Sequence, residues 1–174
     1  MKEKISVLTS IILLSVTAWS AYAAPTDIYL VRHAEKQQSA KKDPALSLCG
    51  VAQAQAMAAL IISPLSVIYH SGYQRTEQTA QQIALTHQQA PLQPYNAADL
   101  PAIAAKILQQ DNSLLVVGHS NTTAELIQLL SQQPGPQITE QDYGVVYHLK
   151  QSPQGYRLSD YKIKQPAECS QSSG

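Results

Sequence analysis

Short apolar runs and amphipathic stretches alternate along the chain from about residue 24 onward. An apolar run of four to eight residues between polar boundaries predicts a buried strand. Such runs lie at residues 27–32, 66–70 and 113–119, and a Pro-containing stretch over 90–95 is expected to hold a further short strand. Two more segments, 145–149 and 156–158, are expected to be strands near the C-terminus. The last two are separated by a Pro/Gly loop, which favours an antiparallel pair.

Between these runs, apolar residues recur at the spacing of an amphipathic helix. The inward face of the first helix is predicted to comprise Leu48, Val51, Ala54, Ala58 and Ile61. A second helix is predicted over 74–86, and a third, capped by Asp99, includes Leu100, Ile103, Ala104, Ile107 and Leu108. A fourth is predicted to open at Thr122 or Thr123. This alternation predicts a three-layer α/β fold, with a mainly parallel sheet, helices on both faces and an antiparallel pair at the C-terminal end.

The N-terminal segment differs from the rest of the chain. A weakly basic start precedes a nearly uncharged apolar stretch over 5–19, and Ala21-Tyr22-Ala23 offers a cleavage site for signal peptidase. We expect residues 1–23 to be a cleaved signal peptide, 24–164 a single domain and 165–174 a polar tail. The location would then be periplasmic or secreted. The alternative is an uncleaved membrane anchor, which the short apolar run disfavours.

Charge is nearly balanced, with 12 Lys and Arg against 12 Asp and Glu. Cleavage of the signal would remove Lys2, Glu3 and Lys4 and leave 10 basic residues against 11 acidic ones. Since no basic run occurs, we expect no nucleic-acid partner, and after signal cleavage no stable membrane insertion.

Two cysteines, Cys49 and Cys169, follow the expected cleavage site. In an oxidising compartment they favour a disulfide that ties the tail to the first helix. The alternative is a buried Cys49 and a loose thiol at Cys169. Two cysteines without a Cys-x-x-Cys motif argue against a structural zinc site.

Cationic side chains follow the ends of three predicted strands. Arg32 and His33 end the first, a short loop leads from the second to Arg75, and His119 ends the fourth. Because parallel strands meet at one edge of a sheet, these groups are expected to converge there. Arginine forks match phosphate oxygens, and a neutral histidine can attack phosphorus. The helix beginning after Asn121 would add backbone N–H donors, so the pattern predicts a phosphoryl pocket.

The same residues resemble the histidine phosphatase superfamily, also called phosphoglycerate-mutase-like. The family's Arg-His-Gly/Ala strand end is matched by Val31-Arg32-His33-Ala34-Glu35, and its helix-opening Arg-x-x-x-Thr-Ala by residues 75–80. Its later Gly-His is matched by Gly118-His119, and Leu46-Ser47 with Gly50 is similar to the start of its first helix. Together the matches span about residues 27–130.

The resemblance implies a phosphatase in which His33 becomes phosphohistidine, while Arg32, Arg75 and His119 bind the phosphoryl oxygens. It implies a small phosphorylated substrate, with an envelope sugar phosphate as one option, and neither metal nor other cofactor. Further candidates for substrate contact are Ser120, Asn121 and Lys36.

The proton donor to the leaving group is less well defined. Some family members use an acidic residue directly after the second histidine, where this chain has Ser120. Others use a Glu between the second and third motifs, where Asp99 is the best-placed carboxylate although it is also a predicted helix cap. Without a strong acid, substrates with good leaving groups are expected. A phosphate-binding module without turnover, or a phosphomutase, are the alternatives.

Overall fold

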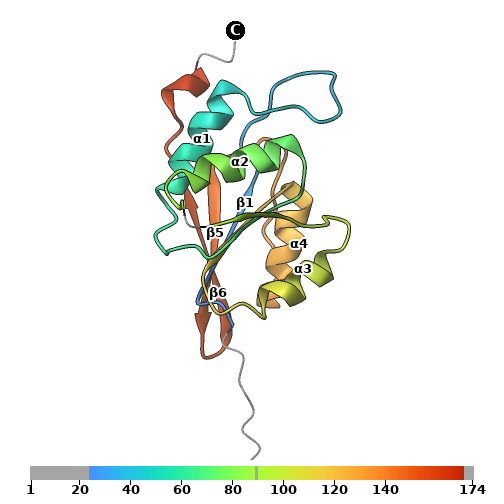
Figure 1. The fold of residues 1–174 in the computed structure, drawn as a ribbon, viewed down its shortest axis with the longest axis vertical. Coiled ribbons are helices and arrows are strands. Elements are labelled where there is room, and N and C mark those ends of the chain that lie inside the picture. Colours follow the sequence, from blue (N-terminus) through green and yellow to red (C-terminus); the bar gives the residue numbers. More distant parts are fainter. Residues whose placement is uncertain (1–23, 89, 171–174) are drawn as a thin grey trace, which may run out of the picture.

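The computed structural model describes residues 24–88 and 90–170, which form a sheet covered by helices on both faces (Figure 1). The expected signal peptide at 1–23 and the last four residues of the tail lie outside the described residues. Within those ranges, no helix is long and apolar enough to cross a membrane.

Six strands form one sheet in the order β3-β2-β4-β1-β5-β6. β1, β2, β3 and β4 run parallel, and β5 and β6 are antiparallel additions beside β1. The strands are β1 Asp27–Arg32, β2 Ile68–His70, β3 Leu92–Pro94, β4 Leu114–Gly118, β5 Val145–Ser152 and β6 Gly155–Lys162. The mainly parallel sheet with a C-terminal antiparallel pair is therefore confirmed.

Alternate residues of β1 face two separate apolar cores. Tyr29 and Val31 belong to the core beneath α1 (Leu48–Ala58) and α2 (Gln74–Ala84). Ile28 and Leu30 belong to the core beneath α3 (Leu100–Ile107) and α4 (Ser120–Ser131). Burial of β1 on both faces follows from its near-continuous apolar sequence, which is typical of parallel sheets.

The first helix is rotated relative to its predicted face. Leu48 was expected to point inward, but it is 84% exposed. The buried positions of α1 are Cys49, Gly50, Gln53, Ala54, Met57 and Ala58. The Ser47 side chain caps the helix by accepting the N–H of Gly50, and a Cβ at Gly50 would collide with the carbonyl oxygen of Glu35. This close approach fixes the first turn with Leu48 directed outward.

The fourth helix begins earlier than predicted. It starts at Ser120 with His119 as the N-cap residue, rather than at Thr122 or Thr123. The hydroxyl of Thr122 lies inside the first turn, where it accepts the N–H of His119 at 2.9 Å. The threonine therefore supports the cap from within the helix.

The C-terminal segment is joined to α1 beside the sheet edge. A disulfide links Cys49 to Cys169, which lies in a short 3-10 helix, η1 (Ala167–Ser170). The side chain of Gln53 donates to that of Gln165 and accepts the N–H of Glu35, at 3.0 Å each. The tail thus contacts the loop that follows His33 through a single glutamine.

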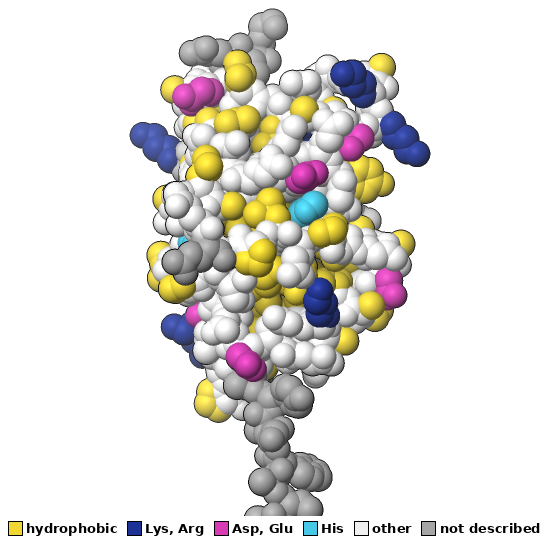
Figure 2. Space-filling model, viewed as in Figure 1, with side chains coloured by type: hydrophobic (Ala, Val, Ile, Leu, Met, Phe, Trp, Pro, Cys, Tyr) yellow, Lys and Arg dark blue, Asp and Glu magenta, His cyan; other side chains and the backbone are white. Residues whose placement is uncertain are grey.

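Charged side chains are scattered on the face of the molecule shown in Figure 2, where lysines and arginines form no cluster. The expectation of no nucleic-acid partner is in keeping with this face but stays a prediction.

Candidate active site

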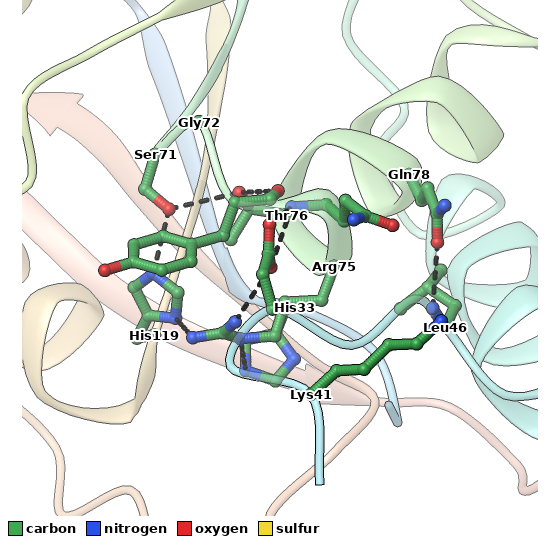
Figure 3. Close-up of polar contacts among 12 residues, drawn as sticks. His33, Lys41, Leu46, Ser71, Gly72, Arg75, Thr76, Gln78 and His119 are labelled. Atoms are coloured by element: carbon green, nitrogen blue, oxygen red, sulfur yellow. Dashed lines mark hydrogen bonds and ion pairs between the residues drawn. The ribbon is translucent and has the colours of Figure 1, made fainter. Parts of the chain in front are cut away.

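The ends of β1 and β4 bring two histidines together. Arg32 pairs with Gly118 in the parallel register, so His33 and His119 each follow directly at the same edge. The His33 N–H donates to the Gly118 carbonyl at 2.9 Å, and the two imidazole centroids are 5.4 Å apart. Arg75, from the first turn of α2, points between them (Figure 3).

Hydrogen bonds define the tautomer of His33. Its Nδ1 lies 2.8 Å from the carbonyl oxygen of Ala34, which can only accept, so Nδ1 carries the proton. Its Nε2 lies 3.2 Å from Nε of Arg75, which can only donate. Nε2 therefore presents a lone pair on the side of the guanidinium.

Both histidines are held neutral at physiological pH. Burial, together with the charges of Arg32, His119 and Arg75, lowers the pKa of His33 to about 3, although the Ala34 carbonyl opposes the shift. Burial and the charges of Arg75 and Arg32 lower the pKa of His119 to about 4. A neutral imidazole is the form that can act as a nucleophile.

A chain of hydroxyl groups orients His119. Its Nε2 lies 2.8 Å from Oγ of Ser71, which is 3.0 Å from Oγ1 of Thr76. The Thr76 hydroxyl donates to the carbonyl of Tyr73 at 2.8 Å, so its only proton is already used. Ser71 must then donate to Thr76 and accept from His119. The chain places the His119 proton on Nε2 and leaves Nδ1 facing Arg75, 3.5 Å away.

Arg75 is held from three sides. It contacts His33 and His119, and its Nη1 lies 3.3 Å from a carboxylate oxygen of Asp43. The guanidinium also lies over the ring of Tyr73, 4.5 Å from its centroid. Asp43 accepts the N–H of Gln74 as well, so the loop before α1 and the start of α2 position Arg75 together.

Arg32 is directed toward the segment that precedes β5. Its side chain is only 3% exposed; it donates to the Thr139 carbonyl at 2.7 Å and to the Glu140 carboxylate at 2.9 Å. The guanidinium lies against the Tyr143 ring, 4.3 Å from the centroid. Its Nε is buried and has no hydrogen-bond partner among the described residues. A bound oxyanion would satisfy such a donor.

A hollow of about 460 Å³ lies at this edge and contains most of the predicted residues. His33, Arg75, His119, Ser120, Asn121 and Lys36 line it, together with Glu140. The N-terminal turn of α4 therefore lies at the hollow, where its positive dipole end favours an anion. Arg32 does not line the hollow, but it forms an ion pair with Glu140, which does.

Asp99 is not among the lining residues. It is exposed, and its carboxylate accepts the N–H of Ala102 as the cap of α3. From the same loop, Ala97 and Ala98 line the hollow instead. The structure therefore does not bring this candidate proton donor to the histidines.

Sequence reasoning missed Ser71, Tyr73, Asp43 and Glu140. Ser71 and Tyr73 lie between β2 and Arg75, so proximity to a motif could have indicated them. Glu140 comes from an irregular stretch without periodicity and reaches the site because β5 pairs with β1. No group of three or more His, Cys, Asp or Glu residues that could hold a metal ion occurs in the described part of the chain.

Comparison with known proteins finds a family match over part of the chain. The model of the histidine phosphatase superfamily (branch 1) matches residues 28–101. No protein with a curated description matches the sequence significantly.

Solved structures share the fold at low identity. A candidate phosphohistidine phosphatase SixA from Agrobacterium tumefaciens superposes with a TM-score of 0.62 at 20% identity, covering 80% of this chain and 99% of that one. The protein histidine phosphatase SixA complexed with tungstate superposes with a TM-score of 0.59 at 15% identity, and the match covers 83% of this chain and 99% of that one. A mycobacterial glucosyl-3-phosphoglycerate phosphatase complexed with VO3 superposes with a TM-score of 0.60 at 15% identity, and the match covers 80% of this chain and 100% of that one. The family model thus matches residues 28–101, and these solved structures share the fold over at least 80% of the chain.

Proposed function

We propose that the protein is a phosphatase that works through a phosphohistidine on His33. The observation that carries this proposal is the fixed tautomer of His33, whose Nε2 lone pair lies beside the Arg75 guanidinium. Substrate oxygens would take over the N–H groups of Arg75 and so free the lone pair for attack. The bond from Nε2 to phosphorus forms as the bond to the leaving group breaks.

The surrounding cations support both chemical steps. Arg75 and the N-terminus of α4 would hold the phosphoryl oxygens, and Arg32 would supply further positive charge. His119 lies beside Arg75 as a neutral imidazole. The Ala34 carbonyl stabilises the proton on Nδ1 while the ring carries the phosphoryl group. Water then attacks phosphorus, which releases phosphate and restores His33. We propose that these groups perform the reaction without a metal ion.

The leaving group receives little help from this chain. Asp99 does not line the hollow, and a hydrogen bond from Ser120 together with the charge of Arg32 outweighs burial and holds the pKa of Glu140 below its usual range. Glu140 is therefore ionised at neutral pH and cannot donate a proton. We propose that substrates with good leaving groups are turned over fastest.

We also propose that the protein is exported. The N-terminal signal pattern and the Cys49–Cys169 disulfide both suit a periplasmic or secreted enzyme. The proposed substrate is a small phosphorylated compound.

The decisive experiment is release of phosphate from 4-nitrophenyl phosphate with a chelator present. The wild-type protein should release phosphate from this ester, whereas His33→Ala should lose activity by a factor of about 10³ or more. His87→Ala, which changes a histidine outside the hollow, is the matched control and should remain active. Tight binding of phosphate without turnover of any ester would instead favour a phosphate-binding module, which the missing proton donor makes the second candidate.

A further inference from the structure

A second hollow, of about 1020 Å³, adjoins the one that contains His33. The two share the side chains of Lys36 and Glu140. A substrate that binds His33 through its phosphoryl group can extend its remaining atoms from the smaller hollow past Lys36 and Glu140. The larger one offers the adjoining space, and its volume is close to the upper limit for small-molecule sites.

The larger hollow is lined by groups that both donate and accept hydrogen bonds. Gln37, Gln38 and Ser39 come from the loop after His33, and Gln141 comes from the segment before β5. No hydrogen bond within the described ranges occupies the three amide side chains. Side-chain amides and hydroxyls complement hydroxyl and amino groups of a ligand, and Tyr143 adds an aromatic wall.

The ionised groups of this hollow are unfavourable for an anion. Its charged lining consists of Glu35, Glu140 and a single cation, Lys36. Glu35 is fixed in place by Ser47, whose hydroxyl donates to its carboxylate at 2.7 Å. The neighbouring lysines of the loop, Lys41 and Lys42, do not line the hollow.

The two arginines of the centre are already balanced by carboxylates. Arg32 pairs with Glu140 at 2.9 Å, and Arg75 pairs with Asp43 at 3.3 Å. A doubly charged phosphoryl group bound beside them makes the surroundings negative. Among the described residues that line the larger hollow, Lys36 is then the cation left for a second anionic group on the same substrate, and Glu35 balances its charge.

We propose that the larger hollow holds the leaving group and selects polar leaving groups without negative charge. This inference rests on the proposed phosphatase activity. It favours phosphorylated compounds that carry hydroxyl or amino groups, and it disfavours compounds that carry a second phosphate or a carboxylate.

Three aryl phosphates of similar size test the inference, because their phenolate leaving groups need little protonation. They are 4-(hydroxymethyl)phenyl, 4-(aminomethyl)phenyl and 4-carboxyphenyl phosphate. We expect kcat/KM for the carboxylate to be about tenfold below that for the hydroxymethyl compound, and the aminomethyl compound to be equal or better. Since the effect is electrostatic, it should shrink as salt is added.

A charge-adding variant identifies the hollow as the cause. Gln141→Lys should lower KM for the carboxylate severalfold relative to KM for the hydroxymethyl compound. Gln154→Lys adds the same charge in the exposed β5–β6 turn at the other end of the sheet and should change neither. Equal kcat/KM for the three esters, or no response to Gln141→Lys, would overturn the inference.

Failure of the phosphatase proposal would be recognised separately. If wild type releases no phosphate from any of the three esters, the proposed activity is wrong. The selectivity can then still be decided by calorimetry with His33→Ala protein, in which the carboxylate should bind about tenfold more weakly. Equal affinities would reject it.

Discussion

Replacing His33 by asparagine should make the protein less sensitive to mild acid. The burial and neighbouring charges that keep His33 neutral also oppose its protonation in the folded state. In the unfolded chain the imidazole titrates near its ordinary pKa of 6.5. The contribution of His33 to stability is therefore complete above pH 6.5 and is lost progressively as the pH falls toward 3.

The size of the effect can be worked out at pH 5. There the unfolded chain is protonated at this position, whereas the folded protein, with a pKa of about 3, is not. One pKa unit corresponds to about 1.36 kcal/mol, so proton uptake favours the unfolded state by about 2 kcal/mol at pH 5. His119, with its pKa lowered to about 4, adds a smaller loss, because it is less buried than His33 and solvent screens its charge. Carboxylates with lowered pKa values, such as Asp27 and Glu140, stay ionised at this pH.

Urea unfolding at pH 7 and pH 5, in buffers without phosphate, measures this loss directly. Between the two pH values, wild type should lose about 2 kcal/mol more free energy of unfolding than His33→Asn. Asparagine can still donate to the Ala34 carbonyl, so the local backbone should persist. If both proteins lose the same free energy, His33 is not the buried neutral group described above.

Two further changes test the supports of the site. Ser71→Ala removes the acceptor of the His119 proton and should lower kcat/KM for 4-nitrophenyl phosphate about tenfold. Ser71→Thr keeps a hydroxyl group and should retain most of the activity. Wild-type kinetics in both variants would mean that the hydroxyl chain does not orient His119. Replacing Cys49 and Cys169 together by serine opens a loop with a sequence separation of 120 and should cost about 3–5 kcal/mol in urea unfolding. Unchanged urea midpoints would argue against that cost.

Local signals in the sequence were sufficient for much of the fold and for the centre of the site. The apolar run over 27–32 has the same bounds as β1, because its ends coincide with a change from apolar to charged residues. The register of β1 with β4 then makes the convergence of His33 and His119 a consequence of topology.

The remaining features depend on contacts that periodicity does not encode. Leu48 fits an apolar helical face, but the approach of Gly50 to Glu35 determines the rotation of α1. Asp99 and Ala97 are two residues apart, and only the cap of α3 decides which one reaches the hollow. Glu140 could not be placed without knowing that β5 lies beside β1.

The position of β1 in the sheet also orders events during synthesis. Among the described strands β1 is the first to emerge, yet its two neighbours are β4 and β5, which follow much later in the chain. Until residue 150 has been made, at least one edge of β1 has no partner, and Arg32 lacks the segment that binds it. A chain truncated before β5 would therefore be inactive and prone to aggregate through that open edge.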